Sequence, residues 1–272
     1  MKRCAGWPIS VCTWSMSNDF CRLDVLMKET GIDHVHLDLR PVCTNPSKNY
    51  IDEVCRRGWA FSAAMIGFEQ EDYSTLETIR ATGGIVPDAC WPQNKAYFLK
   101  AIETAARLGI GFLSAHIGFI DHASIGSYKT LLDRMTLLAD AAAQKNVMLL
   151  METGQETAEE LRQFLNDLNH PAVGINIDPA NMILYGKGDP VEAVGILAHW
   201  IRHVHIKDAV ASQIPGQWGT EVVWGTGQVG AETFLSALKE IGYRGAVAVE
   251  REAGQTRHDD IRVAIERLIH FR

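Results

Sequence analysis

Four short apolar segments in the second half of the chain each end on a residue that can bind a metal ion. They span residues 147–152, 173–178, 201–205 and 246–250. Short apolar runs of this length are typical of the buried strands of a parallel sheet. Because the carboxyl ends of neighbouring parallel strands lie at one edge of a sheet, we expect the end residues to converge on one point. These residues are Glu152, Asp178, His205 and Glu250.

This set of side chains predicts a site for one divalent cation. Three carboxylates and a neutral imidazole suit Mn²⁺, Mg²⁺, Co²⁺ or Zn²⁺. Without an ion, the carboxylates would repel one another and their pKa values would rise. Each residue alone has a plainer explanation, as a solvated charge at a strand end or a hydrogen-bonded core histidine. Their repetition on four successive segments favours the metal site. His203, two residues before His205 on the same strand face, is expected in the core one layer below it.

The segments that must position these ligands alternate between strand-like and helix-like patterns along the whole chain. Thr157 and Glu160 form the sequence pattern of a capping box, and glycine follows several helix-like segments, as in left-handed C-caps. The strand-like segments are residues 9–14, 34–39, 61–66, 112–117, 147–151, 173–177, 203–206 and 246–249. The helix-like segments are residues 20–30, 49–57, 95–108, 128–144, 157–168, 190–200, 231–241 and 259–269.

Eight strand–helix units in 272 residues predict an α/β protein with a (β/α)8 TIM barrel fold. An open, doubly wound sheet shows the same alternation. No GxGxxG motif follows the first strand, which removes the usual dinucleotide-binding form of that sheet. No linker or low-complexity tract divides the chain, so we expect residues 1–272 to form a single domain.

Further candidate site residues follow the predicted strands, because a TIM barrel carries its active site at the carboxyl ends of its strands. Lys207 lies on the same strand face as His205 and is expected to contact a substrate oxygen. Asp208 is expected to orient Lys207 or His205. Asn181, three residues after Asp178, is expected to donate a hydrogen bond to a substrate hydroxyl.

Three other side chains are candidates for contact with the substrate or for support of the site. His116 ends the fourth strand and is placed to bind substrate, or else packs in the core. Trp14 ends the first strand and is expected to form an apolar wall for a sugar ring. Glu156, one helical turn after Glu152, is expected to support it. Asp38, at the end of the second strand, is read either as a site residue or as a simple strand-end charge.

Two loops at the same end of the predicted barrel are candidates for a role in binding. Residues 67–91 form a long insertion after the third strand, which is read as a lid over the site or as a solvated loop with a short helix. Residues 225–230 precede a predicted helix and are rich in glycine. Such a helix start can hold a phosphate, but a plain turn fits this pattern better.

The composition limits the class of protein and its partners. The net charge is −7 at pH 7, whereas nucleic-acid-binding proteins usually carry a basic face. The six cysteines lie in the first third without a CxxC pair, so we expect reduced thiols in a cytoplasmic protein. The first residues lack the apolar stretch of a signal peptide, and no long apolar run indicates a membrane span. We therefore expect neither nucleic acid nor a membrane as a partner.

Several motifs together resemble the sugar phosphate isomerase/epimerase family, a group within the xylose-isomerase-like TIM barrel superfamily. The resemblance covers nearly the whole chain and includes the strand-end His116. It implies that the four strand-end residues bind the ion and that Glu152 and Glu250 act as an acid/base pair. It also implies a small-molecule carbohydrate substrate and a homodimer or homotetramer. The motifs are Leu150-Met-Glu152-Thr-Gly, Ile177-Asp178-Pro-Ala-Asn181, His203-Val-His205-Ile-Lys207-Asp208, Gly225-Thr-Gly-Gln-Val-Gly230, Gly242-Tyr-Arg-Gly245 and Val249-Glu250.

Two positions depart from the pattern of the ketose 3-epimerases in this family. Many of those enzymes carry a histidine at the position of Asn181 and an arginine at the position of Ala211. Both groups contact the substrate in such relatives. The departures leave open which sugar this chain binds.

The resulting hypothesis is a divalent-metal-dependent isomerase or epimerase of a ketose or related sugar, with or without a phosphate. A glutamate removes a proton next to a carbonyl, the metal stabilises the enediolate, and the second glutamate returns a proton. One alternative is a dehydratase or lyase on a keto-cyclitol or 3-keto-glycoside, which shares the first step. An apurinic endonuclease-like DNA repair enzyme fits less well, because it needs more metal ligands and a basic surface. A non-catalytic sugar-binding protein would not need the two intact glutamates.

Overall fold

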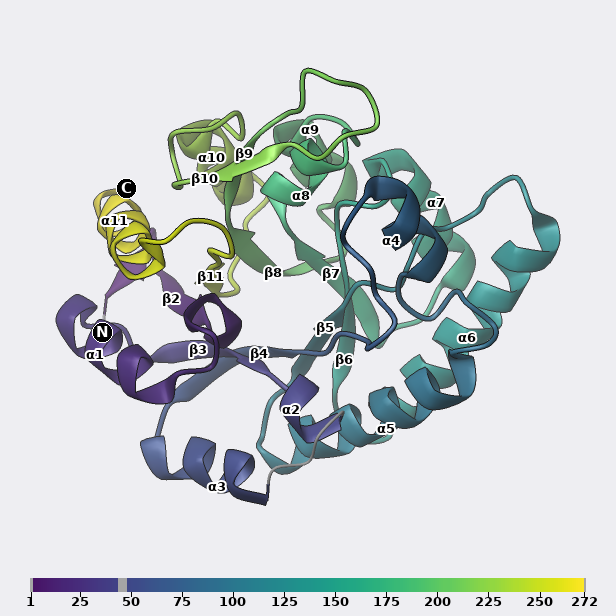
Figure 1. The fold of residues 1–272 in the computed structure, drawn as a ribbon, viewed down its shortest axis with the longest axis horizontal. Helices are drawn as coiled ribbons and strands as arrows, with labels where there is room; N and C mark the ends of the chain where they lie inside the picture. The colour runs from purple at the N-terminus through teal and green to yellow at the C-terminus, as the bar shows by residue number, and fades with distance from the viewer. Residues whose placement is uncertain (1, 44–47, 272) are drawn as a thin grey trace.

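Eight parallel strands close into a barrel within residues 2–43 and 48–271, the part that this computed structural model describes. The order around the barrel is β2, β11, β8, β7, β6, β5, β4 and β3, and β3 pairs again with β2 (Figure 1). The predicted TIM barrel in a single domain is confirmed, while Met1, residues 44–47 and Arg272 lie outside the described residues. The barrel strands are β2 (Trp7–Cys12), β3 (His34–Asp38), β4 (Ala60–Met65), β5 (Phe112–Ala115), β6 (Met148–Glu152), β7 (Val173–Ile177), β8 (Ile201–Ile206) and β11 (Val247–Val249).

The helices that follow these strands cover the outside of the barrel (Figure 1). All the predicted helices are present, and their ends differ from the prediction by at most four residues. The largest difference is at α5, which begins at Trp91 because Pro92 fits the first turn of a helix, where no backbone N–H is needed. These helices are α1 (Phe20–Thr30), α3 (Lys48–Arg57), α5 (Trp91–Arg107), α6 (Ile125–Ala143), α7 (Ala158–Leu168), α9 (Pro190–Leu197), α10 (Ala231–Glu240) and α11 (Arg257–His270).

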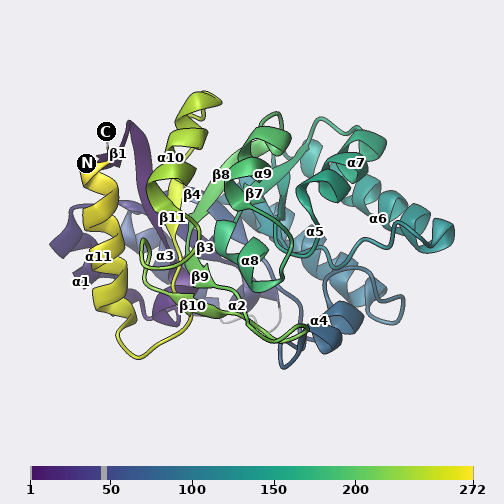
Figure 2. The same ribbon diagram turned by 90° about the horizontal axis from the view of Figure 1, so that it is seen from above.

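Short elements lie in the loops, and apart from the short helix that was one reading of residues 67–91 they were not predicted. Figure 2 shows α2, α4, β9 and β10 gathered at one end of the barrel and β1 at the other. The first strand was predicted to reach Trp14, but it ends at Cys12 and a single 3-10 turn carries Trp14 instead. None of the described helices is both long and apolar enough to cross a membrane. The short elements are β1 (Arg3–Cys4), η1 (Thr13–Met16), α2 (Arg40–Cys43), α4 (Leu76–Thr82), α8 (Pro179–Leu184), β9 (Asp208–Val210) and β10 (Thr220–Val222).

Packing between the barrel and its helices supplies most of the apolar core. Phe98 of α5, Phe164 of α7 and Phe234 of α10 are buried against the strands.

Capping residues fix where the helices start. The side chain of Thr157 accepts a hydrogen bond from the backbone N–H of Glu160, and the Glu160 side chain accepts one from the N–H of Thr157, so the predicted capping box is confirmed.

A layer of hydrogen-bonded polar side chains fills the inside of the barrel. His203 Nδ1 lies 2.9 Å from Asn176 Oδ1, and its Nε2 lies 3.1 Å from Ser62 Oγ. His36 Nε2 lies 3.1 Å from Ser114 Oγ. Burial lowers the pKa of His203 well below its usual value and lowers the pKa of His36 to about 3, so both imidazoles are neutral. His203 is therefore a core residue, as the sequence predicted.

The long segment after β4 is anchored to the barrel at Gly84. The side chains of Gln70 and Asn94 donate hydrogen bonds to the Gly84 carbonyl, at 2.9 and 2.8 Å. Gly84 has a φ of +63°, and a Cβ there would lie 2.0 Å from the carbonyl carbon of Ile117. Only glycine allows both this backbone conformation and this close approach.

We therefore expect Gly84→Ala to destabilise the protein more than the same change at a left-handed glycine with open space around it. Gly109 is the matched control, because its φ is +72° and a Cβ added there would meet nothing within 4 Å. Gly109→Ala should lower the free energy of unfolding by about 1 kcal/mol. Gly84→Ala should lower it by about 2–4 kcal/mol, since backbone atoms must also move. Urea unfolding measures both values, and equal losses would contradict the packing argument.

Candidate metal centre and active site

The four predicted ligands meet at the carboxyl end of the barrel. Glu152 ends β6, Asp178 follows β7, His205 lies in β8 and Glu250 follows β11. His205 Nδ1 lies 3.2 Å from Glu152 Oε1, 3.4 Å from Asp178 Oδ2 and 3.0 Å from Glu250 Oε2. One possible ligand atom from each residue lies within 4.8 Å of the others. Adjacent parallel strands have thus brought together side chains that are far apart in the sequence.

The hydrogen bonding of these residues fits a bound cation. Glu152 Oε2, Asp178 Oδ2, Glu250 Oε2 and His205 Nδ1 are buried and have no hydrogen-bond partner. A buried polar atom without a partner costs roughly 1–3 kcal/mol. A divalent ion would use one unpaired atom from each residue, and the oxygen and nitrogen donors suit Mn²⁺, Mg²⁺, Co²⁺ or Zn²⁺.

The charged groups at the centre strongly shift one another's pKa values. Burial acts to lower the pKa of His205, but the carboxylates of Glu250 and Glu152 outweigh it and hold that pKa well above its usual value. Burial acts to raise the pKa of Glu250, but Lys207 and His205 hold it well below the usual range. For Asp178 burial prevails over Lys207 and raises the pKa. The group therefore holds more negative charge than its own cations neutralise, which favours an additional cation.

A second layer behind His205 fixes the direction of its ring. His205 Nε2 lies 3.0 Å from His36 Nδ1 and 3.1 Å from Asn176 Nδ2. Partners of this kind orient a metal-binding imidazole and select its tautomer. With Nε2 held by the barrel interior, Nδ1 faces the three carboxylates. His36 was not among the predicted site residues, although it lies two residues after His34 and therefore on the same face of β3.

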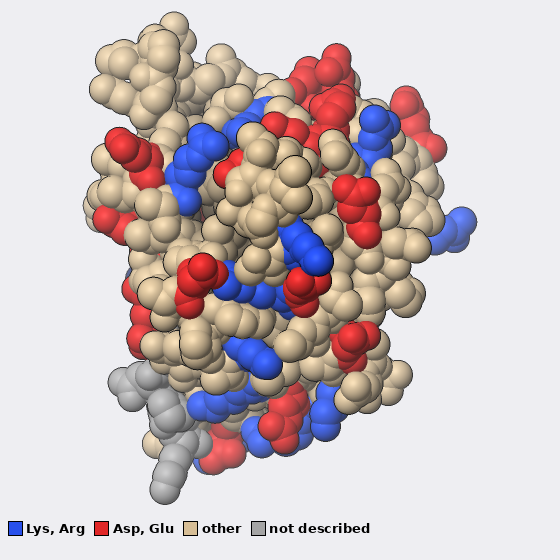
Figure 3. Space-filling model, turned by 90° about the vertical axis from the view of Figure 1, so that its right-hand side faces the viewer, with Lys and Arg blue, Asp and Glu red and all other residues tan. Residues whose placement is uncertain are grey.

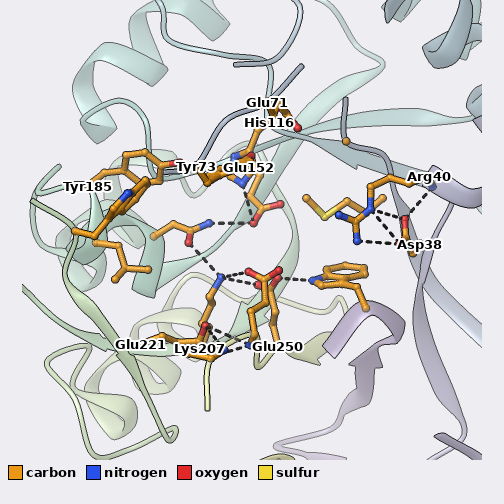
Figure 4. Close-up of a pocket in the computed structure, with 18 of the residues that line it drawn as sticks. Asp38, Arg40, Glu71, Tyr73, His116, Glu152, Tyr185, Lys207, Glu221 and Glu250 are labelled. Atoms are coloured by element: carbon orange, nitrogen blue, oxygen red, sulfur yellow. Dashed lines mark hydrogen bonds and ion pairs between the residues drawn. The ribbon is translucent and has the colours of Figure 1, made fainter. Parts of the chain in front are cut away.

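A pocket of about 520 Å³ opens above the centre, and most of the predicted substrate-binding residues line it (Figure 4). Trp14 Nε1 donates a hydrogen bond to Glu250 Oε1 at 2.6 Å. Asn181 Nδ2 donates to Glu152 Oε1 at 3.1 Å. His116 Nε2 lies 3.6 Å from Glu152 Oε1. Three of the predicted substrate contacts therefore also hold one of the two glutamates in place.

Lys207 reaches into the same pocket and lies among carboxylates. Its Nζ lies 3.3 Å from Glu250 Oε2 and 3.2 Å from Glu252 Oε2, and it donates a hydrogen bond to Asn181 Oδ1 at 3.4 Å. Burial acts to lower the pKa of Lys207, but Glu250 and Glu252 outweigh it and raise that pKa well above its usual value. The side chain is therefore an ammonium ion, as a contact for a substrate oxygen requires.

Asp208 does not have the role that was expected of it. Its carboxylate accepts hydrogen bonds from the backbone N–H groups of Gly225, Gly227 and Val229, at 2.9, 2.9 and 3.1 Å. It has no such bond to Lys207 or His205 among the described residues. The glycine-rich loop before α10 therefore binds a carboxylate of its own chain, which fits the plain turn that was preferred there over a phosphate site.

Asp38 and Glu156 are also held by their own surroundings. Asp38 lines the pocket and forms a two-pronged pair with Arg40, whose Nε and Nη2 donate to it at 3.0 and 2.9 Å. Glu156 is buried outside the pocket lining, and its Oε1 accepts a hydrogen bond from the N–H of Ile120 at 3.0 Å. The expected contact of Glu156 with the site is absent from the described hydrogen bonds. It joins the strand-end loops to each other instead.

Several pocket residues were missed because they lie outside the predicted strands, in loops or, for Glu221, in the short strand β10. The predicted lid segment, residues 67–91, contributes Glu71 and Tyr73 to the lining. The segment is a short helix with tightly bonded turns, and its movement as a lid stays a prediction. Other missed lining residues follow β7, β9 and β11 in the chain. They are Tyr185, Trp218, Glu221 and Glu252.

The chain belongs to the xylose isomerase-like TIM barrel family, whose model matches residues 26–270. It is similar to a xylose isomerase domain protein from Planctomyces limnophilus, at 33% identity and a TM-score of 0.87, with 96% of each chain covered. It shares its fold with a D-allulose 3-epimerase from Methylomonas sp., at 20% identity and a TM-score of 0.70, with 98% of this chain and 97% of that chain covered.

A dehydratase is also among the relatives. An inosose dehydratase from Clostridium botulinum (strain Alaska E43 / Type E3) is 24% identical over 161 residues, which are 53% of this chain and 54% of that protein. The chain thus matches about half the length of this curated relative. The resemblance to the isomerase/epimerase family is confirmed, and members of the superfamily include both epimerases and dehydratases.

The buried Glu156 makes a prediction about stability at alkaline pH. Burial raises the pKa of Glu156 to about 8, so the folded protein holds a proton that the unfolded chain releases near pH 4.5. The contribution of Glu156 to the free energy of unfolding is fully present below pH 4.5, and it is lost as the pH rises from 4.5 towards 8. Glu156→Gln keeps the acceptor for Ile120 and removes the titration. We expect the variant to gain about 2–4 kcal/mol over the parent at pH 8.5 and little at pH 5.

The matched control is Glu160→Gln on the same helix. The hydrogen bond from the Thr157 backbone lowers the pKa of Glu160, so its contribution changes only as the pH falls below about 4.5. The change in the free energy of unfolding caused by Glu160→Gln should therefore be the same at pH 5 and at pH 8.5. Urea unfolding at both pH values measures the two differences, and a pH-independent effect of Glu156→Gln would contradict the prediction.

Proposed function

We propose that the protein is a divalent-metal-dependent isomerase or epimerase of a ketose or related sugar. The observation that carries the proposal is the set of unpaired buried atoms on Glu152, Asp178, His205 and Glu250, which face one another at the floor of a sugar-sized pocket. When bound there, a divalent cation would supply Lewis-acid stabilisation of negative charge on substrate oxygens. The relatives named as epimerase and dehydratase support chemistry next to a carbonyl.

Glu152 and Glu250 are placed to move the proton. They come from β6 and β11, and their carboxylates face the pocket from two sides (Figure 4). Lys207 and His205 lower the pKa of Glu250 against the effect of burial, and His116 and His205 do the same for Glu152. Both are therefore ionised at neutral pH, as a general base requires. One carboxylate removes the proton beside the carbonyl, and the other returns a proton to the opposite face or to the neighbouring carbon.

Asn181, Lys207 and Trp14 hold these carboxylates and the substrate. Asn181 and Trp14 donate to Glu152 and Glu250 and so direct one oxygen of each. Lys207 offers N–H donors to a substrate hydroxyl or a developing oxyanion. We also propose that the substrate is a small carbohydrate. The expected homodimer or homotetramer and the cytoplasmic location stay predictions.

A dehydratase is the second candidate. It shares the proton abstraction but then expels a hydroxyl from the next carbon. The departures at Asn181 and Ala211 from the ketose 3-epimerase pattern favour it, and so does the similarity to an inosose dehydratase. Proton NMR in D₂O with a ketose and with a keto-cyclitol distinguishes the two. An epimerase exchanges a carbon-bound proton without loss of water, whereas a dehydratase forms an unsaturated product.

Two other classes have less support. DNA repair would need a surface that binds phosphates, but acidic and basic side chains alternate on the face shown in Figure 3. The pocket itself is lined mainly by carboxylates among its charged groups. A non-catalytic sugar-binding protein would not need two ionised glutamates aimed at its ligand. Loss of turnover with retained sugar binding in a glutamate variant would exclude that class.

The metal centre makes a prediction that does not depend on turnover. We expect the chelator-treated protein to bind one Mn²⁺, and Asp178→Asn to weaken that binding by more than about 100-fold. Isothermal titration calorimetry measures both. Glu71→Gln is the matched control, because Glu71 is a partly buried carboxylate of the same pocket that lies outside the ligand set. Equal weakening by both changes, or no binding by the parent protein, would contradict the proposed centre.

The two-glutamate mechanism predicts the effect of neutralising Glu250. At saturating Mn²⁺, Glu250→Gln should lower kcat for C–H exchange by about 10²–10⁴-fold, because an amide cannot accept the proton. The far-ultraviolet circular dichroism should be unchanged. Glu103→Gln on the exposed side of α5 serves as control and should retain full exchange. Exchange by Glu250→Gln at the parent rate would show that another group is the base.

A further inference from the structure

The pocket carries a large excess of negative charge. Among its described lining residues, six side chains are carboxylates and two are cations, which leaves a formal charge of −4, or −3 when Arg251 is counted, which pairs with Glu221 at 2.7 Å behind the lining. Beneath them, the negative charge of Asp178 and the positive charge of His205 cancel in the metal-free protein, and a divalent cation bound to a neutral imidazole would raise the sum by only one. In a partly buried pocket these charges are screened less than on the open surface. An anionic ligand would therefore meet repulsion on entry.

Both lining cations are already paired with carboxylates of the chain. Arg40 donates to both oxygens of Asp38, at 3.0 Å from Nε to Oδ1 and 2.9 Å from Nη2 to Oδ2. Lys207 lies 3.3 Å from Glu250 and 3.2 Å from Glu252. A phosphate or carboxylate on the substrate would have to displace one of these pairs. An uncharged hydroxyl can instead share the Lys207 ammonium with its carboxylates.

The loop that most resembles a phosphate cradle is closed to an outside anion. The backbone N–H groups of Gly225, Gly227 and Val229 all bind Asp208. Gly227 leaves no room beside that carboxylate, because a Cβ there would lie 2.3 Å from Asp208 Oδ1. The chain thus supplies its own anion at the position where a phosphate would find donors.

The remaining lining suits the uncharged faces of a sugar. The aromatic side chains of Trp14, Tyr73, Tyr185 and Trp218 contribute to the wall. Tyr185 and Trp218 meet edge to face, with their ring centroids 4.8 Å apart, so they present a fixed apolar edge. Carbohydrate C–H groups pack on such rings, while carboxylates accept hydrogen bonds from hydroxyls.

We propose that the pocket selects an uncharged carbohydrate and discriminates against sugar phosphates and sugar acids. The inference rests on the proposed function for the chemistry, but the charge selectivity comes from the lining residues themselves. Glu252 is expected to affect this selectivity most directly, because its half-exposed carboxylate lines the pocket and pairs with Lys207. Its neutralisation would free a donor on Lys207 and remove one repelling charge.

The test compares sugars that differ only in a phosphate, namely D-fructose with D-fructose 6-phosphate and D-ribulose with D-ribulose 5-phosphate. Ligand-observed NMR titration of the Mn²⁺-free protein, in buffer without metal, gives a dissociation constant for each. We expect the uncharged member of each pair to bind at least about fivefold more tightly. Tighter binding of the phosphorylated member in either pair would overturn the inference.

A pair of variants separates charge from general damage to the pocket. Glu252→Gln should lower the ratio of the dissociation constants, phosphorylated over uncharged sugar, by about two- to fivefold. Glu103→Gln changes the net charge equally but lies on the exposed side of α5, and should leave the preference unchanged. Equal preferences in parent and Glu252→Gln would contradict the role of this carboxylate.

Deuterium exchange at carbon, measured on the same sugars with Mn²⁺ present, tests the proposed function separately. If no sugar exchanges, the isomerase proposal fails, while the binding ratios still decide the charge selectivity. If sugar phosphates exchange with a higher kcat/KM than their uncharged partners, the proposed function stands and the selectivity is wrong.

Discussion

The burial of three carboxylates beside one imidazole is the constraint on which the rest of the site depends. Taking these charges out of water is costly unless cations and hydrogen bonds compensate. Lys207, Trp14 and Asn181 each contact a carboxylate of the group, and His205 contacts all three. One atom on each of the four residues still has no hydrogen-bond partner. In the proposed function, a divalent cation would bind these remaining atoms, and the carboxylates that Lys207, His205 and His116 keep ionised would serve as bases.

Two layers of side chains, one below and one above, surround the buried carboxylates in the barrel. The layer below the centre is uncharged, since His36 and His203 are neutral and hydrogen-bonded to serine and asparagine. It holds the His205 ring without adding charge beneath the carboxylates. The layer above the centre is the pocket, whose wall combines aromatic rings with further carboxylates. This separation places the carboxylates at the floor of the pocket, above an uncharged and hydrogen-bonded barrel interior.

The same excess of negative charge links the chemistry to the choice of substrate. A site that concentrates carboxylates for proton transfer repels anions unless it offers free donors. Here Asp38, Glu252 and Asp208 occupy the donors that a phosphate would use. The departures at Asn181 and Ala211 from the ketose 3-epimerase pattern lie outside this electrostatic argument, and they bear on which hydroxyls the pocket recognises and on whether water is expelled.

The sequence by itself determined the barrel and the identity of the central group. Buried strands have a strong apolar pattern, and ligands at the ends of four successive strands must lie at one rim once the sheet closes. Only the tertiary structure decided what surrounds that group. Asp208 was expected to orient its neighbours at the site, but its carboxylate binds three loop N–H groups. Glu156 was placed at the site by its spacing from Glu152, yet it accepts a hydrogen bond from Ile120. Loops have no periodicity that links spacing to direction, so their side chains become predictable only when the packed structure is known.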